Sequence, residues 1–173
     1  MNINYTEINN TAVFLIKTGL SPEEFLKEKG LSPDDFKNTI INFLKEAEEK
    51  TDSETLDSLI YFIFYFDLRS DEILDILNEL LIETWHYKHE DMVTLIDEYR
   101  SEKSVEYLKK ASNMKLDYLT YEGDEAFALI SKCIHALGNI GNECAIECLI
   151  QLSKHSDSIL SLKAQKQLKR LKL

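Results

Sequence analysis

Residues 124–154 read DEAFALISKCIHALGNIGNECAIECLIQLSK, and this stretch decides the fold. It predicts two helices joined by a tight turn. Asp124 can cap the first helix, and the segment 138–141, with a glycine at each end, is expected to end it, because glycine adopts a left-handed conformation at little steric cost. Asn142 begins the second helix. The apolar residues recur at helical spacing and form two stripes: Ala126, Ile130, Cys133, Ile134 and Leu137, then Ala145, Cys148, Leu149 and Leu152.

A second copy of this pattern lies 41 positions upstream, so that Met92 aligns with Cys133 and Leu108 with Leu149. Helices of this length cannot bury their apolar stripes alone and must stack on neighbours. A spacing of about forty residues is typical of HEAT-type repeats. The sequence therefore predicts an all-α fold, a HEAT-like α-solenoid in which antiparallel helix pairs form a superhelix of about 8–10 helices.

The segment CIHALGNIGNECAIECLIQL, residues 133–152, resembles the HEAT-like repeats of the phycobilisome-lyase type. Those repeats read A-L-G-x-I-G-x-x-x-A-I-x-x-L. The resemblance implies an α-solenoid, and proteins of this kind usually bind other macromolecules.

The remainder of the chain is also predicted to be helical. The segment GLSPEEF (19–25) recurs as GLSPDDF (30–36), and each copy combines a serine N-cap, a proline and two acids at a helix start. The run LIYFIFYF (59–66) is far shorter than the roughly 20 residues of a membrane span, so we interpret it as a buried helix. Helices are expected over 6–18, 22–29, 33–49, 54–66, 73–85, 89–100, 102–113 and 158–171.

We expect one domain over residues 1–173, with a helical cap over 1–50 and repeats over 51–173 that end in a capping helix. In the first helix, Ala12, Val13, Leu15 and Ile16 are expected to face inward. In the last helix, the inward residues are expected to be Leu160, Ala164, Leu168 and Leu171.

Composition limits the possible partners. The chain is 44% hydrophobic and 29% charged, with a net charge of −11. This charge argues against direct binding of nucleic acid, which needs a cationic face, and suits a basic protein partner. The three cysteines lie inside apolar stripes and form no disulfide framework. Without a signal-peptide pattern or a membrane span, we expect a cytoplasmic protein that contacts no membrane.

The segment WHYKHED, residues 85–91, is the densest group of chemically active side chains. His86 and His89 with Glu90 and Asp91 could hold zinc or iron. Deoxyhypusine hydroxylase, also a HEAT-repeat protein, binds iron through several His-Glu pairs, but here only His89–Glu90 forms such a pair. A polar turn whose histidines cap helix ends and a partner-binding surface are the other interpretations. We expect no metal and no cofactor.

Residues 74–152 resemble a group of small bacterial HEAT-repeat proteins that are met as immunity proteins of polymorphic or contact-dependent toxin systems. The match is carried by Trp85, His86, His89, Glu90, Asp91, Tyr118, Tyr121, Asp124, Ala136, Leu137, Gly138, Ile140 and Gly141. The resemblance implies that the chain binds and occludes a cognate toxin domain and catalyses nothing. A HEAT-repeat enzyme, metal-dependent or lyase-like, and a general protein-interaction adaptor are the alternatives.

Acids outnumber bases over residues 67–102, so we expect a partner-binding face that joins the helix 71–85, the WHYKHED turn and the linker around 118–124. Its predicted members are Glu83, Trp85, His86, His89, Glu90, Asp91, Tyr118, Tyr121, Glu122 and Asp124. In the alternative interpretation, Trp85 and the tyrosines only fill the gap between repeats.

Overall fold

The chain is all-α, as the sequence predicted. The computed structural model describes residues 3–119 and 127–172, and these contain helices and no strand. The backbone groups into two compact units, Met1–Ile76 with Trp85–Tyr87, and Leu77–Thr84 with Lys88–Leu173. Helix α5 (Asp71–Leu80) contributes residues to both. The predicted cap over 1–50, the single domain and the solenoid arrangement stay predictions.

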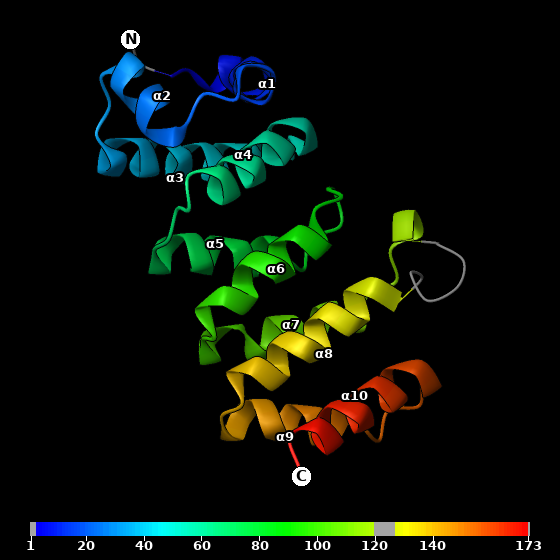
Figure 1. Cartoon of the computed structure of the whole chain (residues 1–173). Helices are drawn as coiled ribbons and strands as arrows, with labels where there is room; N and C mark the ends of the chain where they lie inside the picture. Colours follow the sequence, from blue (N-terminus) through cyan, green and yellow to red (C-terminus); the bar gives the residue numbers. More distant parts are fainter. Residues whose placement is uncertain (1–2, 120–126, 173) are drawn as a thin grey trace. The chain divides into compact units, whose positions relative to one another are not determined.

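In the first unit, α4 (Ser53–Tyr65) packs against both α1 (Ile8–Thr18) and α3 (Pro33–Lys50). The short η1 (Tyr5–Glu7) precedes α1, and α2 (Pro22–Lys29) lies between α1 and α3 in the chain (Figure 1). Three phenylalanines are fully buried, and the ring of Phe36 lies 6.0 Å from those of Phe25 and Phe62. These edge-to-face aromatic contacts form the core of the unit.

The duplicated Ser-Pro segments begin α2 and α3 as predicted. The side chain of Ser21 accepts a hydrogen bond from the backbone N–H of Glu24, and that of Ser32 accepts one from Asp35. Glu24 also reaches back to the N–H of Ser21, which completes a capping box. The two serines therefore satisfy backbone donors that the first helical turn leaves without partners.

Helix α1 corrects one prediction. Val13 and Ile16 were expected to face inward, but they are 47% and 64% exposed. Ile8, Ala12 and Leu15 form the buried stripe instead. This spacing of four and three residues places all three on one helix face, whereas Ile16 lies at the edge of that face and Val13 lies beyond it.

The run at 59–66 forms the C-terminal end of α4 and its cap. Four of its eight residues are buried, as predicted for a buried helix: Leu59, Ile60, Phe62 and Ile63. Across the described residues, no helix combines the length and the apolar character needed to cross a membrane.

Helix α5 is shorter than predicted. It was expected to run to residue 85 but ends at Leu80, although the predicted inward residues Ile73, Leu74 and Leu77 are buried. Beyond Leu80 the backbone tightens, since the N–H of Glu83 bonds to the carbonyl of Leu80. The carbonyl oxygen of Glu83 lies 2.7 Å from the imidazole Nε2 of His89, which connects this turn to the start of α6.

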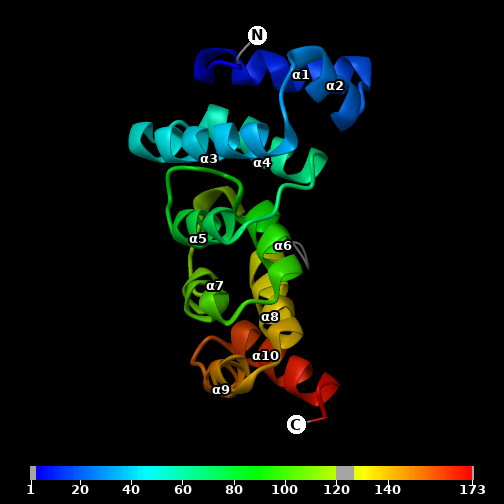
Figure 2. The same ribbon diagram turned by 90° about the vertical axis from the view of Figure 1, so that its left-hand side faces the viewer.

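The second unit contains the two predicted copies. Their elements are α6 (His89–Tyr99), η2 (Glu102–Ser104) and α7 (Val105–Ala111), then α8 (Ala128–Ile140) and α9 (Glu143–Leu152), with η3 (Asp117–Leu119) between the copies and α10 (Ser158–Arg170) after them. Helix α6 packs beside α8, and α7 packs beside α9 (Figure 2). Equivalent helices of the two copies are therefore neighbours.

The turns of the two copies also correspond. Arg100 ends α6 at φ 48°, and Gly141, 41 positions later, ends α8 at φ 62°. Ser101 and Asn142 follow, and each side chain accepts a backbone N–H at the start of the next helix. The alignment made from the apolar residues thus holds for the capping residues as well.

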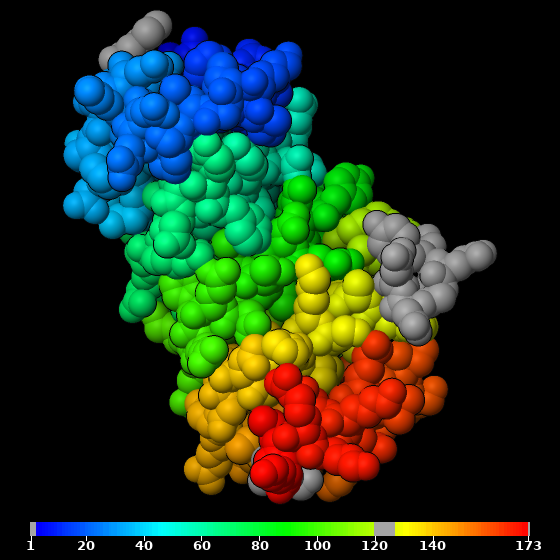
Figure 3. Space-filling view, viewed as in Figure 1, coloured from blue at the N-terminus to red at the C-terminus, as the bar shows by residue number. Residues whose placement is uncertain are grey.

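Helix α8 ends within segment 138–141, as predicted, but Gly138 itself lies inside the helix. Helix α8 continues through it to Ile140, and only Gly141 adopts the left-handed conformation. Gly138 is buried because α10 crosses it closely: a Cβ at this position would lie 1.6 Å from Nε2 of Gln167. In the space-filling view, the red α10 lies against the yellow α8 (Figure 3).

Because α10 approaches Gly138 so closely, the residues of α10 that face inward differ from those predicted. Leu160 and Ala164 are buried as predicted, but the next buried position is Gln167, which is 7% exposed, and not Leu168 or Leu171. Gln167 fills the space above Gly138 although its Nε2 has no hydrogen-bond partner in the described part of the chain.

We predict that Gly138→Ala lowers the free energy of unfolding by about 1–3 kcal/mol, because the added methyl overlaps Gln167. An unstrained Gly→Ala change inside a helix would instead stabilise by about 1 kcal/mol. Urea unfolding followed by circular dichroism measures the difference. In a Gln167→Ala background the same Gly138→Ala change should be neutral or stabilising, and equal destabilisation in both backgrounds would contradict the packing described.

Adjacent residues of α9 give a second prediction. Leu149 is fully buried, whereas Ile150 is 39% exposed. Leu149→Asp should lower the free energy of unfolding by roughly 3 kcal/mol or more, because it buries a charge without a partner. Ile150→Asp adds the same charge to the same helix and should cost less than about 1.5 kcal/mol. Similar melting temperatures for the two variants would show that the orientation of α9 is wrong.

Candidate functional site

The structure distributes the predicted partner-binding residues between its parts. Trp85 and His86 belong to the first unit, where His86 is fully buried and its ring lies 5.2 Å from that of Trp85. Glu83, His89, Glu90, Asp91 and Tyr118 belong to the second unit. Tyr121, Glu122 and Asp124 lie outside the described residues. The predicted face as a whole stays a prediction, and its second-unit members are described next.

His89 is fully buried at the start of α6 and both of its ring nitrogens are engaged. Nε2 lies 2.7 Å from the backbone carbonyl oxygen of Glu83, and Nδ1 lies 2.6 Å from the hydroxyl of Tyr118. A carbonyl can only accept, so Nε2 carries a proton and donates it to Glu83, while Nδ1 is within hydrogen-bond distance of the Tyr118 hydroxyl. His89 therefore ties the turn after α5 to η3.

This bonding bears on the metal interpretation. A histidine binds a metal through a ring nitrogen, and both ring nitrogens of His89 already have partners, Glu83 and Tyr118. Metal binding at His89 would therefore break a buried hydrogen bond. Within residues 3–119 and 127–172, no group of three or more His, Cys, Asp or Glu side chains is arranged to hold a metal ion.

The two acids that follow His89 have ion-pair partners. Lys88 Nζ lies 3.2 Å from Asp91, three residues on. Lys132 Nζ, on α8, lies 3.6 Å from the carboxylate of Glu90 and 3.2 Å from its carbonyl oxygen. These pairs offset much of the negative charge that the sequence assigned to this face.

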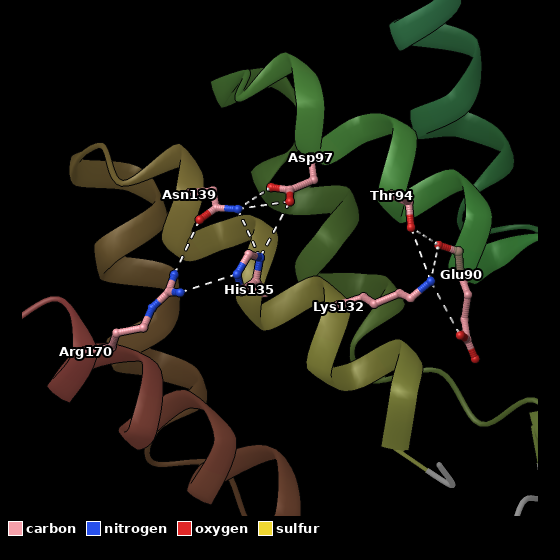
Figure 4. A network of polar contacts seen from close by, with 7 residues as sticks. All are labelled: Glu90, Thr94, Asp97, Lys132, His135, Asn139 and Arg170. Atoms are coloured by element: carbon pink, nitrogen blue, oxygen red, sulfur yellow. Dashed lines mark hydrogen bonds and ion pairs between the residues drawn. The ribbon is translucent and has the colours of Figure 1, made fainter. Parts of the chain in front are cut away.

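A polar network continues along the same side of the unit and joins three helices (Figure 4). The amide of Asn139 on α8 donates to both carboxylate oxygens of Asp97 on α6, at 2.9 Å each. His135 lies 3.6 Å from Asp97, and Arg170 of α10 lies 3.4 Å from both His135 and the amide oxygen of Asn139. Polar contacts thus link α6, α8 and α10 outside their apolar core.

The sequence analysis missed these contacts, although a signal for them exists. The pairs Glu90–Lys132, Asp97–Asn139 and Lys109–Gln151 are all 42 positions apart, close to the repeat spacing. Side chains at equivalent positions of neighbouring repeats lie near each other. A search for complementary polar residues at the repeat spacing would have found them.

Two grooves follow the two rows of equivalent helices. One, of about 300 Å³, lies between α6 and α8 and is lined by Val93, Thr94, Asp97, Ser131, Lys132 and His135. The other, of about 230 Å³, lies between η2–α7 and α9 and is lined by Glu102, Val105, Glu106, Lys109, Cys144, Glu147, Cys148 and Gln151. We call the second the α7–α9 groove.

A third cavity, of about 560 Å³, is lined by residues of 112–119, 127–130 and 155–160. Its floor is apolar, with Leu129 and Leu160 buried, and its rim carries Lys115, Asp117 and Asp157. Asp157 is already engaged, since its carboxylate accepts the N–H groups of Ile159 and Leu160 as the N-cap of α10.

The cysteines are poorly suited to nucleophilic or ligand roles. The thiol of Cys144 donates to Glu102 at 3.0 Å, and this bond raises the pKa of the thiol. Burial raises the pKa of Cys148 to about 11 and also raises the pKa of the fully buried Cys133. All three therefore remain thiols at neutral pH, whereas the thiolate is the reactive form.

No protein-family model, curated protein or solved structure matches this chain, so no residue role is taken from a relative.

We predict that Tyr118→Phe lowers the free energy of unfolding by about 1–3 kcal/mol, because it leaves Nδ1 of the buried His89 without its hydrogen-bond partner. Tyr107→Phe, in the same unit, is the control, since the Tyr107 hydroxyl has no hydrogen bond to the described residues; it should change stability by less than about 0.5 kcal/mol. Chemical unfolding of both variants measures the difference, and an equal effect would exclude the His89 bond.

A second prediction concerns Cys144, which is the exposed cysteine. Because the Glu102 carboxylate raises the pKa of this thiol, alkylation of Cys144 should begin at a higher pH than alkylation of a free cysteine. Glu102→Gln removes the charge and should shift the rate profile to lower pH. Rates of reaction with iodoacetamide across pH 7–10, followed by mass spectrometry, test the direction; an unchanged or upward-shifted profile would contradict it.

Proposed function

We propose that the chain is a non-catalytic binding protein that occludes a basic protein, acting in the cytoplasm as the immunity protein of a bacterial toxin. The observation that carries the proposal is the side-by-side packing of equivalent helices, α6 with α8 and α7 with α9. This packing aligns side chains of the two copies into continuous surfaces with grooves between the helices, which is how repeat proteins present binding faces.

Charge supports a basic partner. The chain carries a net charge of −11. Such a field speeds the encounter with a cationic protein, and a toxin that grips phosphate has a cationic surface. The biological role that we propose, neutralising a toxin, rests on the resemblance of residues 74–152 to immunity proteins.

The bonding of His89 also favours binding over metal catalysis. In the proposed account His89 is a structural residue that fixes the turn after α5 and η3. Glu90, the other member of the only His-Glu pair in the sequence, is directed to Lys132 of the next repeat. The pair that motivated the enzyme alternative therefore serves to hold neighbouring elements together.

The proposal predicts that the chain binds the product of the gene beside its own with a nanomolar dissociation constant and abolishes that protein's toxicity. Co-expression and growth of the host measure the second effect, and calorimetry measures the first. An unrelated basic protein of matched net charge is the control and should bind at least about a hundredfold more weakly. If both proteins bind equally, or if neither binds, the immunity role is wrong; capture without any effect on toxicity would favour the adaptor alternative.

A further inference from the structure

We infer that the α7–α9 groove is where this protein receives a lysine or arginine side chain of its basic partner. The inference rests on the proposed function, because it assumes a basic protein partner. It places the charged contact on α7 and α9, whereas the sequence predicted a face made of the helix 71–85, the WHYKHED turn and the linker around 118–124.

The shape of the groove suits a long cationic side chain. Val105 and Cys148 are 4% and 3% exposed and form an apolar floor, and carboxylates stand at its edges. Lysine and arginine combine an apolar stem with a charged end, so the stem can lie on the floor while the charge reaches the edge. A groove of about 230 Å³ accommodates one such side chain.

The charges of the groove are not balanced internally. Its lining contains three carboxylates, Glu102, Glu106 and Glu147, and one ammonium, Lys109. Lys109 donates to the amide oxygen of Gln151 at 2.8 Å. Glu102 accepts from Asn142 at 2.8 Å and from Cys144 at 3.0 Å. Within the part of the chain that is described, Glu106 and Glu147 have neither a hydrogen bond nor an ion pair.

The repeat explains why these two carboxylates share a groove. Glu106 of α7 and Glu147 of α9 are 41 positions apart and hold equivalent positions on neighbouring helices. Elsewhere in the unit, side chains 42 positions apart on neighbouring helices make complementary polar contacts, as at Asp97–Asn139 and Lys109–Gln151. Both carboxylates line the groove, and neither pairs with a cation of the described residues, so a cationic side chain seated in the groove would face two available carboxylates.

The turn at 85–91, which the sequence predicted to bind the basic partner, is less suited to bind a cationic side chain than the α7–α9 groove. Glu90 and Asp91 already pair with Lys132 and Lys88, so a partner would have to displace those ammonium groups. Glu106 and Glu147 need no such displacement. A cationic side chain can therefore bind in the groove without displacing an ammonium group, whereas binding at the turn would displace Lys88 or Lys132.

The test is a titration of the full chain, labelled with ¹⁵N, with acetylated and amidated tri-arginine at about 50 mM salt, where charge interactions are weakly screened. The largest amide shifts should fall in residues 102–111 and 143–152. Glu106→Gln/Glu147→Gln should weaken peptide binding by about fivefold, since it removes two exposed charge contacts of roughly 0.5 kcal/mol each, about a factor of two to three apiece. The spectrum itself reports whether the variant keeps its fold.

Two control variants remove the same charge. Glu23→Gln/Glu28→Gln changes exposed acids at opposite ends of α2, and Glu90→Gln/Asp91→Asn changes the predicted turn. Both should weaken binding less than about twofold, because they lower only the overall field. Largest shifts outside the two segments, or an equal loss in Glu106→Gln/Glu147→Gln and a control, would overturn the inference.

The complex with the neighbouring gene product separates this inference from the proposed function. If the wild-type chain forms that complex and Glu106→Gln/Glu147→Gln weakens it while the controls do not, the groove is supported as the partner's site. If the complex forms and is insensitive to that variant, the groove assignment is wrong and the proposed function stands. If the wild-type chain forms no complex, the proposed function is wrong, and peptide shifts outside the groove would reject the groove as well.

Discussion

The second unit depends on the packing of α8, which contacts α6, α7, α9 and α10. Each neighbour is accommodated by a different feature of one helix. Cys133 and Leu137 supply a fully buried apolar stripe, Gly138 lets α10 approach closely, and Gly141 ends the helix so that α9 can turn back. Because interiors are closely packed, a change on α8 is transmitted to every element it touches. The grooves exist because α8 and α9 hold α6 and α7 beside them.

Polar contacts between residues separated by about one repeat fix how the packed helices are aligned along each other. Apolar burial favours compact stacking but does not fix how far one helix slides along another. A hydrogen bond such as that between Asn139 and Asp97 is formed only at one register. Such contacts, with Lys132 on Glu90 and Lys109 on Gln151, fix the alignment of the copies. The groove carboxylates are then brought together as a consequence of that alignment.

Much of the fold could be predicted because its signals are local. Helix starts follow from Ser21 and Ser32, the end of α8 from Gly141, and the copies from the periodicity of their apolar residues. The errors arose where a tertiary contact competes with a local preference. Helix α5 was predicted to run to residue 85 but stops at Leu80, before the turn in which the Glu83 carbonyl contacts His89. Gly138 lies inside α8 and makes room for the crossing helix α10, a role that the local sequence does not show. Val13 and Ile16 were misassigned because a mostly apolar helix has two plausible inward faces.

The candidate site was less predictable, for a related reason. Sequence shows the charge of Glu90 and Asp91 but not that Lys132 and Lys88 offset it. It shows His89 but not the two partners that occupy its ring nitrogens. What makes a carboxylate available to a partner is the lack of an internal cation, which depends on three-dimensional neighbours. The repeat spacing is the only sequence signal that brings Glu106 and Glu147 together.

Hydrogen–deuterium exchange of the chain, alone and bound to the neighbouring gene product, tests the central claim most directly. The account predicts that binding slows exchange in the peptides covering η2, α7 and α9, residues 102–111 and 143–152, because a side chain seated in the groove restrains both helices. Protection confined to the first unit or to the turn at 81–91, with α7 and α9 unchanged, would contradict it.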